Sequence, residues 1–560
     1  MQRLCNAILK PGRKSRGASK DTPLEIRGLF AFILLLFILF LIVPLIFLCI
    51  KSFSVNGEFS LASYRAILAS SSFFTALGNS FVVSGVSALI TTCTAFVLAY
   101  TINGTKGPAW FKKGIASAAM LPMLLPTITY GFAIIYSFGK QGLITRLLGF
   151  QPFEIYGFSG LVMGYVIYTI PIAFMLINNT YQYIDKQFSV VSRVLGDGRL
   201  KTFMSTTLKP LSATLGAAFV QSFFLSFTDF GIPAAVGGQY KVVATLLYNQ
   251  MLGAIPNFSR GAVIAVVMML PSIFSILLLS RLERCNYRFS KISKAALPKN
   301  TPRDIGFTLL TALILLGILS IFAVIFIVPF TESWPYALGF SLDNIKAILR
   351  DDQLLQVYKN ALITAALTAL LGTLTAYGCA LVTARSKMPK GCKSLIDVLV
   401  QITNTVPGMV IGIAYLLAFS GTPLQCSFAI LVICNIVHYF STPYLMVKNA
   451  LSKMNASWET TGLLMGDSWT KTIFRVVVPN SMPTILEMLS YYFVNAMVTI
   501  SAVIFIVGAR TMVITTKIKQ LQHFGDFEQI FVLSLMILAT NIAAKLILSF
   551  LSKKFKGRTP

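Results

Sequence analysis

Apolar runs of about 20 residues recur along this chain, separated by polar stretches that carry most of its charged side chains. A helix of that length crosses the hydrocarbon core of a membrane, which is about 30 Å thick. The first run is too long for a signal-peptide core and has no small-residue cleavage site, so we expect a retained anchor. About twelve membrane-spanning helices are predicted, near 28–50, 76–102, 115–138, 157–179, 211–236, 260–281, 306–330, 357–384, 394–420, 425–447, 482–507 and 527–551.

The composition agrees with an all-α polytopic membrane protein. Of the 560 residues, 56% are hydrophobic and 12% are charged, whereas soluble domains carry about 25% charged residues. Soluble, collagen-like, disordered and secreted disulfide-rich classes are therefore excluded. The eight cysteines form no CxxC pair, and the chain has two histidines, His438 and His523. We expect no metal site and no cofactor.

The net charge of +28 would suggest a nucleic-acid partner in a soluble protein, but its distribution favours a membrane explanation. With the N-terminus placed in the cytoplasm, the inner segments hold 34 Lys and Arg residues and the outer loops hold 11. Basic residues gather in the cytoplasmic loops of membrane proteins. The sequence therefore predicts a lipid bilayer as partner, no nucleic acid, and both termini in the cytoplasm.

The two parts of the chain repeat each other at fixed offsets. Asn79 and Asn360 are 281 residues apart, and Gly196 and Gly466 are 270 apart. Because each copy has six predicted spans, both enter the membrane in the same direction and form a parallel repeat. The predicted organisation is a basic N-terminal segment (1–27), a first half of six helices (28–281), a cytoplasmic linker (282–305), a second half of six helices (306–551) and a cytoplasmic tail (552–560).

A shared motif lies in the cytoplasmic loop after the fourth span of each half, in the first loop (190–211) and the second loop (460–481). A glycine can adopt the left-handed conformation that ends a helix, and the next aspartate can cap the helix that follows. Two short helices with a bend at the glycine are therefore predicted in each loop. The matched residues are Gly196 and Gly466, Asp197 and Asp467, Lys201 and Lys471, Phe203 and Ile473, with Pro210 and Pro479 closing the motif.

This motif resembles the EAA loop of binding-protein-dependent ABC importer permeases. The two copies depart from the family at its Glu-Ala-Ala, which reads Val190, Val191 and Ser192 in the first loop and Thr460, Thr461 and Gly462 in the second, where Glu459 stands one place early. The fused layout is similar to permeases of the ferric-iron, thiamine and phosphonate type, in which one chain replaces a permease dimer.

The resemblance implies a permease in a bacterial inner membrane, with the two loops coupling it to a pair of ATP-binding subunits. An extracytoplasmic solute-binding protein would deliver a small solute, such as ferric iron or a phosphonate. The sequence contains no Walker A pattern, so ATP hydrolysis is expected on a separate subunit and this chain is not an enzyme.

Candidate pathway residues lie in the fifth and eleventh spans, which follow directly from the loops. Asp229 is an acid at membrane depth, where acids are costly and often functional, although it equally fits a hydrated cap at the outer interface. The repeat places Thr499 at the matching position. The candidate pathway residues are Thr228, Asp229, Thr499, Pro126 and Pro407, and the two prolines alternatively mark kinks without a binding role.

Two other functions compete with the importer permease. A secondary, ion-coupled transporter is also built from six plus six helices, but it normally needs several acids or histidines at membrane depth. An intramembrane enzyme would need a cluster of reactive side chains at one depth. The sequence favours the permease over both, and it does not identify the solute.

Overall fold

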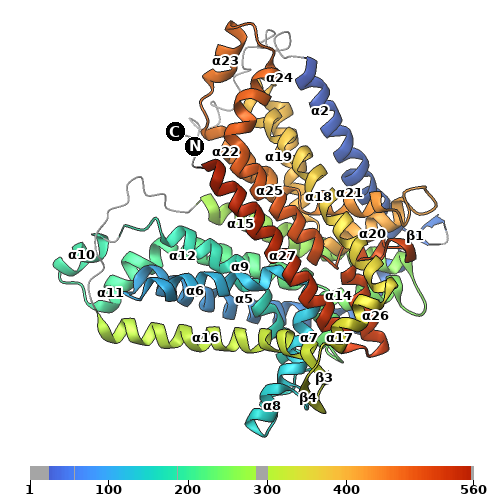
Figure 1. Cartoon of the computed structure of the whole chain (residues 1–560). Coiled ribbons are helices and arrows are strands. Elements are labelled where there is room, and N and C mark those ends of the chain that lie inside the picture. Colours follow the sequence, from blue (N-terminus) through green and yellow to red (C-terminus); the bar gives the residue numbers. More distant parts are fainter. Residues whose placement is uncertain (1–23, 56, 186, 285–299, 557–560) are drawn as a thin grey trace.

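The structure is a computed structural model of the chain, and it describes residues 24–55, 57–185, 187–284 and 300–556. Most of the predicted N-terminal segment and linker, and the end of the predicted tail, lie outside these residues. The described chain is almost entirely helical, as expected for an all-α polytopic membrane protein (Figure 1).

The helical elements of the first half are α2 (Leu24–Phe37), η1 (Ile38–Ile42), α3 (Val43–Ser52), α4 (Ala62–Leu68), α5 (Ser71–Gly104), α6 (Ala109–Met120), η2 (Leu121–Leu124), α7 (Thr127–Phe138), α8 (Leu143–Leu148), α9 (Phe158–Tyr181), α10 (Gln187–Val194), α11 (Arg199–Phe203), η3 (Met204–Leu208), α12 (Lys209–Thr228), α13 (Gly231–Val236), α14 (Val243–Leu252) and α15 (Phe258–Arg284). A short hairpin follows the first span, with β1 (Ser54–Val55) antiparallel to β2 (Glu58–Phe59).

The helical elements of the second half are α16 (Thr301–Ile327), η4 (Val328–Phe330), α17 (Asp343–Arg350), α18 (Asp352–Arg385), α19 (Lys390–Thr405), α20 (Gly408–Ala418), α21 (Phe428–His438), α22 (Ser441–Lys453), α23 (Ser457–Leu464), α24 (Trp469–Thr472), η5 (Ile473–Val477), α25 (Val478–Val498), η6 (Val503–Phe505), η7 (Ala509–Thr511), α26 (Ile514–Phe524) and α27 (Phe527–Lys556). Again a hairpin follows the first span of the half, with β3 (Thr331–Ser333) antiparallel to β4 (Ala337–Phe340).

Within the described residues, 8 helices are long and apolar enough to cross a membrane, or up to 11 if each sharply bent helix pair is one span. The helix in the predicted eleventh span, α25, is not among these candidates, so the count of twelve stays a prediction. Two predicted spans, 115–138 and 394–420, are each broken into two helices, at angles of 110° and 103°.

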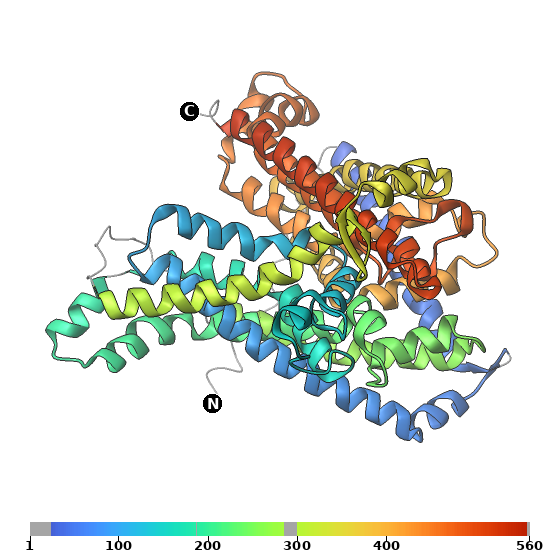
Figure 2. The same cartoon turned by 60° about the horizontal axis from the view of Figure 1, so that its bottom comes forward.

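The first helix of each half packs against the other half. The segment α2–η1–α3 contacts α18, α20 and α21, whereas α16 contacts α5, α6 and α7. The Tyr415 hydroxyl donates to the Phe40 carbonyl at 2.5 Å, and Thr101 and Thr311 share a hydrogen bond of 2.7 Å. Figures 1 and 2 show α16, in yellow-green, lying along the blue and teal helices of the first half.

The apolar core is continuous across the two halves. One cluster of buried side chains runs from Leu48 and Phe73 in the first half to Tyr415 and Phe531 in the second. In Figure 1 the two bundles diverge from this shared region, with α10 and α11 at the far end of one bundle and α23 and α24 at the far end of the other. The two loops therefore lie well apart, each at the tip of its own bundle.

Candidate functional site

The bend predicted in each loop is present and is centred on the expected glycine. Gly196 has φ of +85° and Gly466 has φ of +82°, both in the left-handed region. The Asp197 N–H donates to the Ser192 carbonyl at 3.1 Å, and the Asp467 N–H donates to the Gly462 carbonyl at 2.9 Å. These are the hydrogen bonds of a helix that ends at a glycine. The same local interactions therefore produce the same bend in both loops.

The predicted role of the aspartates as helix caps is wrong. The N-cap of α11 is Gly198, without a side-chain hydrogen bond, and the N-cap of α24 is Ser468, whose side chain accepts from the Lys471 N–H. Asp197 instead pairs with Lys201 at 2.7 Å, and Asp467 pairs with Lys471. Each helix begins one residue later than predicted, so the aspartate stands before the N-cap and its carboxylate pairs with the lysine four residues on.

The Asp197 carboxylate is held by two hydrogen bonds. The Lys201 ammonium is the larger cause and the Ser192 hydroxyl, at 2.8 Å, is the second, and together they lower the pKa of Asp197 below its usual value. Asp197 is therefore charged throughout the physiological range, and its pair with Lys201 links α10 to α11 across the bend.

The two short helices of each loop approach closely, but the contact differs between the copies. In the first loop the Ser192 hydroxyl donates to the Thr202 side chain at 3.1 Å. In the second loop the matched residues are Gly462 and Thr472, and a Cβ atom at Gly462 would lie 2.3 Å from Thr472 Oγ1. In the first loop a hydrogen bond joins the two short helices. In the second loop they approach closely because Gly462 has no side chain. The helix–bend–helix shape is the same in both loops.

Large apolar side chains project from both bends at matched positions. Val194 is 81% exposed and Leu464, its counterpart 270 residues later, is 83% exposed. By contrast, the predicted site residues Phe203 and Ile473 face inward, where Phe203 contacts the ring of Tyr100 and Ile473 is buried. Pro479 lies in the first turn of α25. The exposed pairs are Val194 and Leu464, Leu195 and Met465, and Met204 and Phe474.

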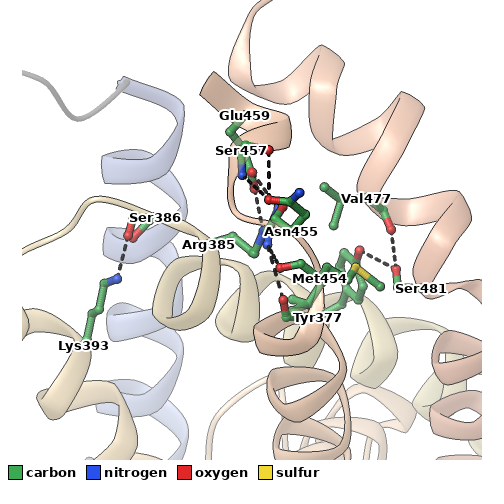
Figure 3. A network of polar contacts seen from close by, with 11 residues as sticks. Tyr377, Arg385, Ser386, Lys393, Met454, Asn455, Ser457, Glu459, Val477 and Ser481 are labelled. Carbon is green, nitrogen blue, oxygen red and sulfur yellow. Dashed lines mark hydrogen bonds and ion pairs between the residues drawn. The ribbon is translucent and has the colours of Figure 1, made fainter. Parts of the chain in front are cut away.

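The second loop is fastened to its bundle by an ion pair that the sequence analysis did not identify. The Arg385 guanidinium, at the end of α18, donates to both carboxylate oxygens of Glu459 at 2.6 Å (Figure 3). It also donates to the carbonyls of Met454 and Asn455. The Arg385 side chain is only 4% exposed. The one available signal was Glu459 itself, the acid that stands one place early in the motif.

The predicted proline positions are true helix breaks. Pro126 precedes α7 and Pro407 precedes α20, with nearly the same backbone angles (φ −61°, ψ 145° and φ −59°, ψ 148°). Proline fixes φ and removes the N–H that a continuing helix would need. Each proline thus stands at a break between two helices, and whether it lines the pathway or only bends the chain stays open.

A second break lies at Asp229 in the first half and at Thr499 in the second. Helix α12 ends at Thr228, and Asp229 is extended, with φ of −73° and ψ of 140°. Helix α25 ends at Val498, and Thr499 has φ of −69° and ψ of 135°. The matched breaks leave the following segments, α13 and η6, free to turn toward the proline breaks.

Asp229 is buried and acts as a cap. Its carboxylate accepts from the Ile232 N–H at 2.9 Å and from the Thr127 hydroxyl. At the matched position, the Tyr439 hydroxyl bonds to the Thr499 side chain. Asp229 therefore caps the start of α13 from a buried position, not from a hydrated one, and its role in the pathway stays a prediction.

Within each half the two breaks fit against one another through a glycine. Helix α7 packs on α13, and α20 packs on η6. A Cβ atom at Gly131 would lie 2.3 Å from the Ala235 Cβ atom, and one at Gly412 would lie 2.2 Å from the Ala502 carbonyl oxygen. Backbones can approach this closely because glycine has no side chain. The candidate pathway residues of each half are therefore parts of one interlocked unit.

The described residues contain no group of His, Cys, Asp and Glu side chains arranged to hold a metal ion. The site consists of two bent loops at the bundle tips, each followed by a long helix that ends at a break in the interior.

Comparison with known proteins supports the resemblance seen in the loops. Residues 354–557 match the family model described as the inner membrane component of binding-protein-dependent transport systems. This match and the relatives below support a permease of the binding-protein-dependent ABC importer type, with two halves fused into one polypeptide.

Some relatives match most of this chain and others match about half of it. The ferric transport system permease FbpB of Actinobacillus pleuropneumoniae is 26% identical over 88% of this chain and 74% of its own length. A putative ferric transport permease FbpB 1 of Haemophilus influenzae is 26% identical over 86% of this chain and 78% of its own. A spermidine/putrescine permease PotC homologue of Mycoplasma pneumoniae is 23% identical, covering 99% of itself but 50% of this chain.

Proposed function

We propose that this chain forms the membrane pathway of an ATP-driven importer, with one ATP-binding subunit docked on the first loop and a second on the second loop. ATP hydrolysis belongs to those subunits. The observation that carries the proposal is the set of exposed apolar pairs at matched positions of the two bends, led by Val194 and Leu464. Apolar side chains exposed beside charged ones are typical of protein interaction surfaces.

The proposed docking surface predicts the outcome of a simple experiment. Leu464→Ser with Met465→Ser, and Val194→Ser with Leu195→Ser, remove the apolar groups without touching the glycine bend. We expect the amount of ATPase subunit that co-purifies, and the uptake of solute, to fall together. The control is Leu147→Ser with Leu148→Ser in α8, which are also exposed but belong to a predicted outer loop. Full co-purification in the loop variants would overturn the proposal.

The orientation of the proposed importer follows from the charge asymmetry of 34 inner to 11 outer basic residues. Both termini and the loops are proposed to be cytoplasmic. In a background without native cysteines, Lys106→Cys should resist a membrane-impermeant thiol reagent added to intact cells. Lys140→Cys, on the opposite side, should react. The reverse pattern would overturn the orientation and, with it, the docking of ATPase subunits on these loops.

We further propose that Thr228, Asp229, Thr499, Pro126 and Pro407 belong to the gate of the pathway. The supporting observation is that Asp229 and Thr127 share a hydrogen bond, which ties the break after α12 to the break before α7. A movement of the first loop reaches α12 first, because α11, η3 and α12 are continuous. Separating Asp229 from Thr127 would unlock the two breaks in the first half.

The solute is proposed to be small and to arrive from an extracytoplasmic binding protein, as the class implies. Two relatives that match most of this chain are ferric transport permeases by name, so ferric iron is the first candidate and a phosphonate or similar solute the second. Uptake of radiolabelled ferric iron and of a labelled phosphonate, in cells with and without this chain, tests both. Uptake that persists without any ATPase partner would favour an ion-coupled transporter instead.

A further inference from the structure

A cavity of about 460 Å³ lies directly beneath the first loop. Its walls come from the ends of α5 and α9, from α10 and α11, and from the start of α16. Three arginines from three different elements line it, namely Arg193 of α10, Arg199 of α11 and Arg303 of α16. One acidic side chain, Asp185, lines the same cavity. The cavity therefore lies where the first loop, the helices of the first half and α16 of the second half meet.

The cavity exists because two side chains are small where the second half has an ion pair. At the repeat offset of 281, Gly104 matches Arg385, and at the offset of 270, Ser189 matches Glu459. In the second half, Arg385 and Glu459 fill this space and fasten the loop to α18 (Figure 3). In the first half, Gly104 and Ser189 line the cavity instead. At these two positions a glycine and a serine therefore stand in the first half where the second half has the Arg385–Glu459 ion pair.

The lining has the chemistry of a phosphate site. Within the described part of the chain, Arg193 and Arg199 form no ion pair, and both are exposed at the cavity. Arg303 bonds to Asp304 at 2.7 Å. Guanidinium groups match the geometry of a phosphate and bind it through paired hydrogen bonds. Beside them, the rings of Tyr100 and Phe307 lie 4.4 Å apart, and they offer an apolar surface to whatever carries the phosphate.

We infer that this cavity binds the phosphate group of an anionic ligand, held by Arg193, Arg199 and Arg303. The bound anion joins the cationic side chains of the first loop to Arg303 of α16. It thereby adds to the contacts that already hold this loop, such as Phe203 against Tyr100. The source of the phosphate is either a small soluble ester or the headgroup of an anionic phospholipid.

Binding is measured on the purified full-length chain. Inorganic phosphate should bind the wild-type chain in detergent, as followed by calorimetry, and Arg193→Gln with Arg199→Gln should weaken binding about tenfold or more, since each lost charge-assisted bond is strong. The control, Lys453→Gln with Arg475→Gln, removes the same charge from exposed positions near the second loop and should bind normally. Equal weakening in the control, or no binding by the wild type, would overturn the site.

The source is distinguished in nanodiscs. If the ligand is a lipid, chain purified into phosphatidylglycerol nanodiscs should no longer bind inorganic phosphate, whereas chain in phosphatidylcholine nanodiscs should. If the ligand is soluble, phosphate should bind equally in both. Either result supports a phosphate site, and absence of binding in both kinds of nanodisc would overturn it.

A second variant tests phosphate binding while all three arginines stay in place. Ser189→Glu places a carboxylate at the position that matches Glu459, in the lining of the cavity that the three arginines share. It should abolish phosphate binding and fasten the loop permanently, whereas Ser189→Gln should retain most binding. Unaltered phosphate binding by Ser189→Glu would contradict the inference.

The effect on transport, unlike the binding, rests on the proposed function. Uptake by the wild type should rise with phosphate or anionic lipid, and uptake by Ser189→Glu should be independent of both. Failure of this step with intact binding would count against the role of the loop in transport and would leave the anion site in place.

Discussion

The first and second loops have the same shape but different attachments, and the comparison separates what is local from what is not. Each loop bends at a left-handed glycine and carries an Asp–Lys pair four residues apart. The second loop is also fixed by Arg385 to Glu459 and by Thr470 to Glu25 of α2. The first loop lies over a cavity instead. The bend is therefore a self-contained unit, and the attachment is an independent property of each half.

The strongest test of the shared shape is to remove both bends. Gly196→Val and Gly466→Val force a β-branched residue into the left-handed region, at about 1–2 kcal/mol each. We expect uptake and co-purification of the ATPase to be nearly lost in the double variant, with Gly196→Val the milder single change. Gly198→Ala is the matched control, because Gly198 has an ordinary φ of −64° and open space around it. Normal transport by the double variant would contradict the coupling role of the bends.

The attachment of the second loop is tested by Arg385→Gln. The change leaves the Glu459 carboxylate, which is 16% exposed, without its cation. We expect a loss of about 2–3 kcal/mol, less than for a fully buried pair because water reaches Glu459. The measurement is the denaturation midpoint of the purified chain. Glu459→Gln added to Arg385→Gln should restore part of the loss, and an equal loss in the double variant would show that the charge is not the cause.

The matched breaks at Asp229 and Thr499 offer a comparison within the interior. Asp229→Leu removes the acceptor for the Ile232 N–H and the Thr127 hydroxyl, a cap of about 1–2 kcal/mol, and should reduce uptake per assembled complex. Thr499→Val, which loses one hydroxyl contact, should reduce it less. Uptake is normalised to the ATPase that co-purifies. An unchanged normalised rate for Asp229→Leu would remove Asp229 from the gate.

The smallest effect is expected from the exposed pair of the first loop. Because hydrogen bonds from Lys201 and Ser192 lower the pKa of Asp197, the carboxylate stays charged until the pH falls through that lowered value. Any stability from the pair is present above the usual pKa of about 3.9 and is lost only below it. Lys201→Ala should therefore leave the denaturation midpoint unchanged between about pH 6 and 8. A pH-dependent midpoint in that range would point to another titrating group.

The sequence predicts well those features that depend on residues close together in the chain. The bends at Gly196 and Gly466 follow from glycine chemistry and a helix end, and the apolar runs mark the helices. The cap assignment for Asp197 was wrong because α11 begins one residue later than predicted, with Gly198 as its N-cap. The broken helix at Pro126 was left open, since the break depends on the fit of Gly131 against Ala235, more than 100 residues away. The contact of Arg385 with Glu459, which spans 74 residues, has no local signal.

The exchange of the first helices bears on the order in which the chain is made. The hydrogen bond between Phe40 and Tyr415 joins residues that are 375 positions apart. Segment α2–η1–α3 therefore enters the membrane long before its partner helices have been synthesised. This segment is stable in lipid before those helices are made, because a strongly apolar helix satisfies its own backbone hydrogen bonds there. The contacts of α16 with α5, α6 and α7 form only after the start of the second half has been synthesised, so the first half is completed after its own last helix has been made.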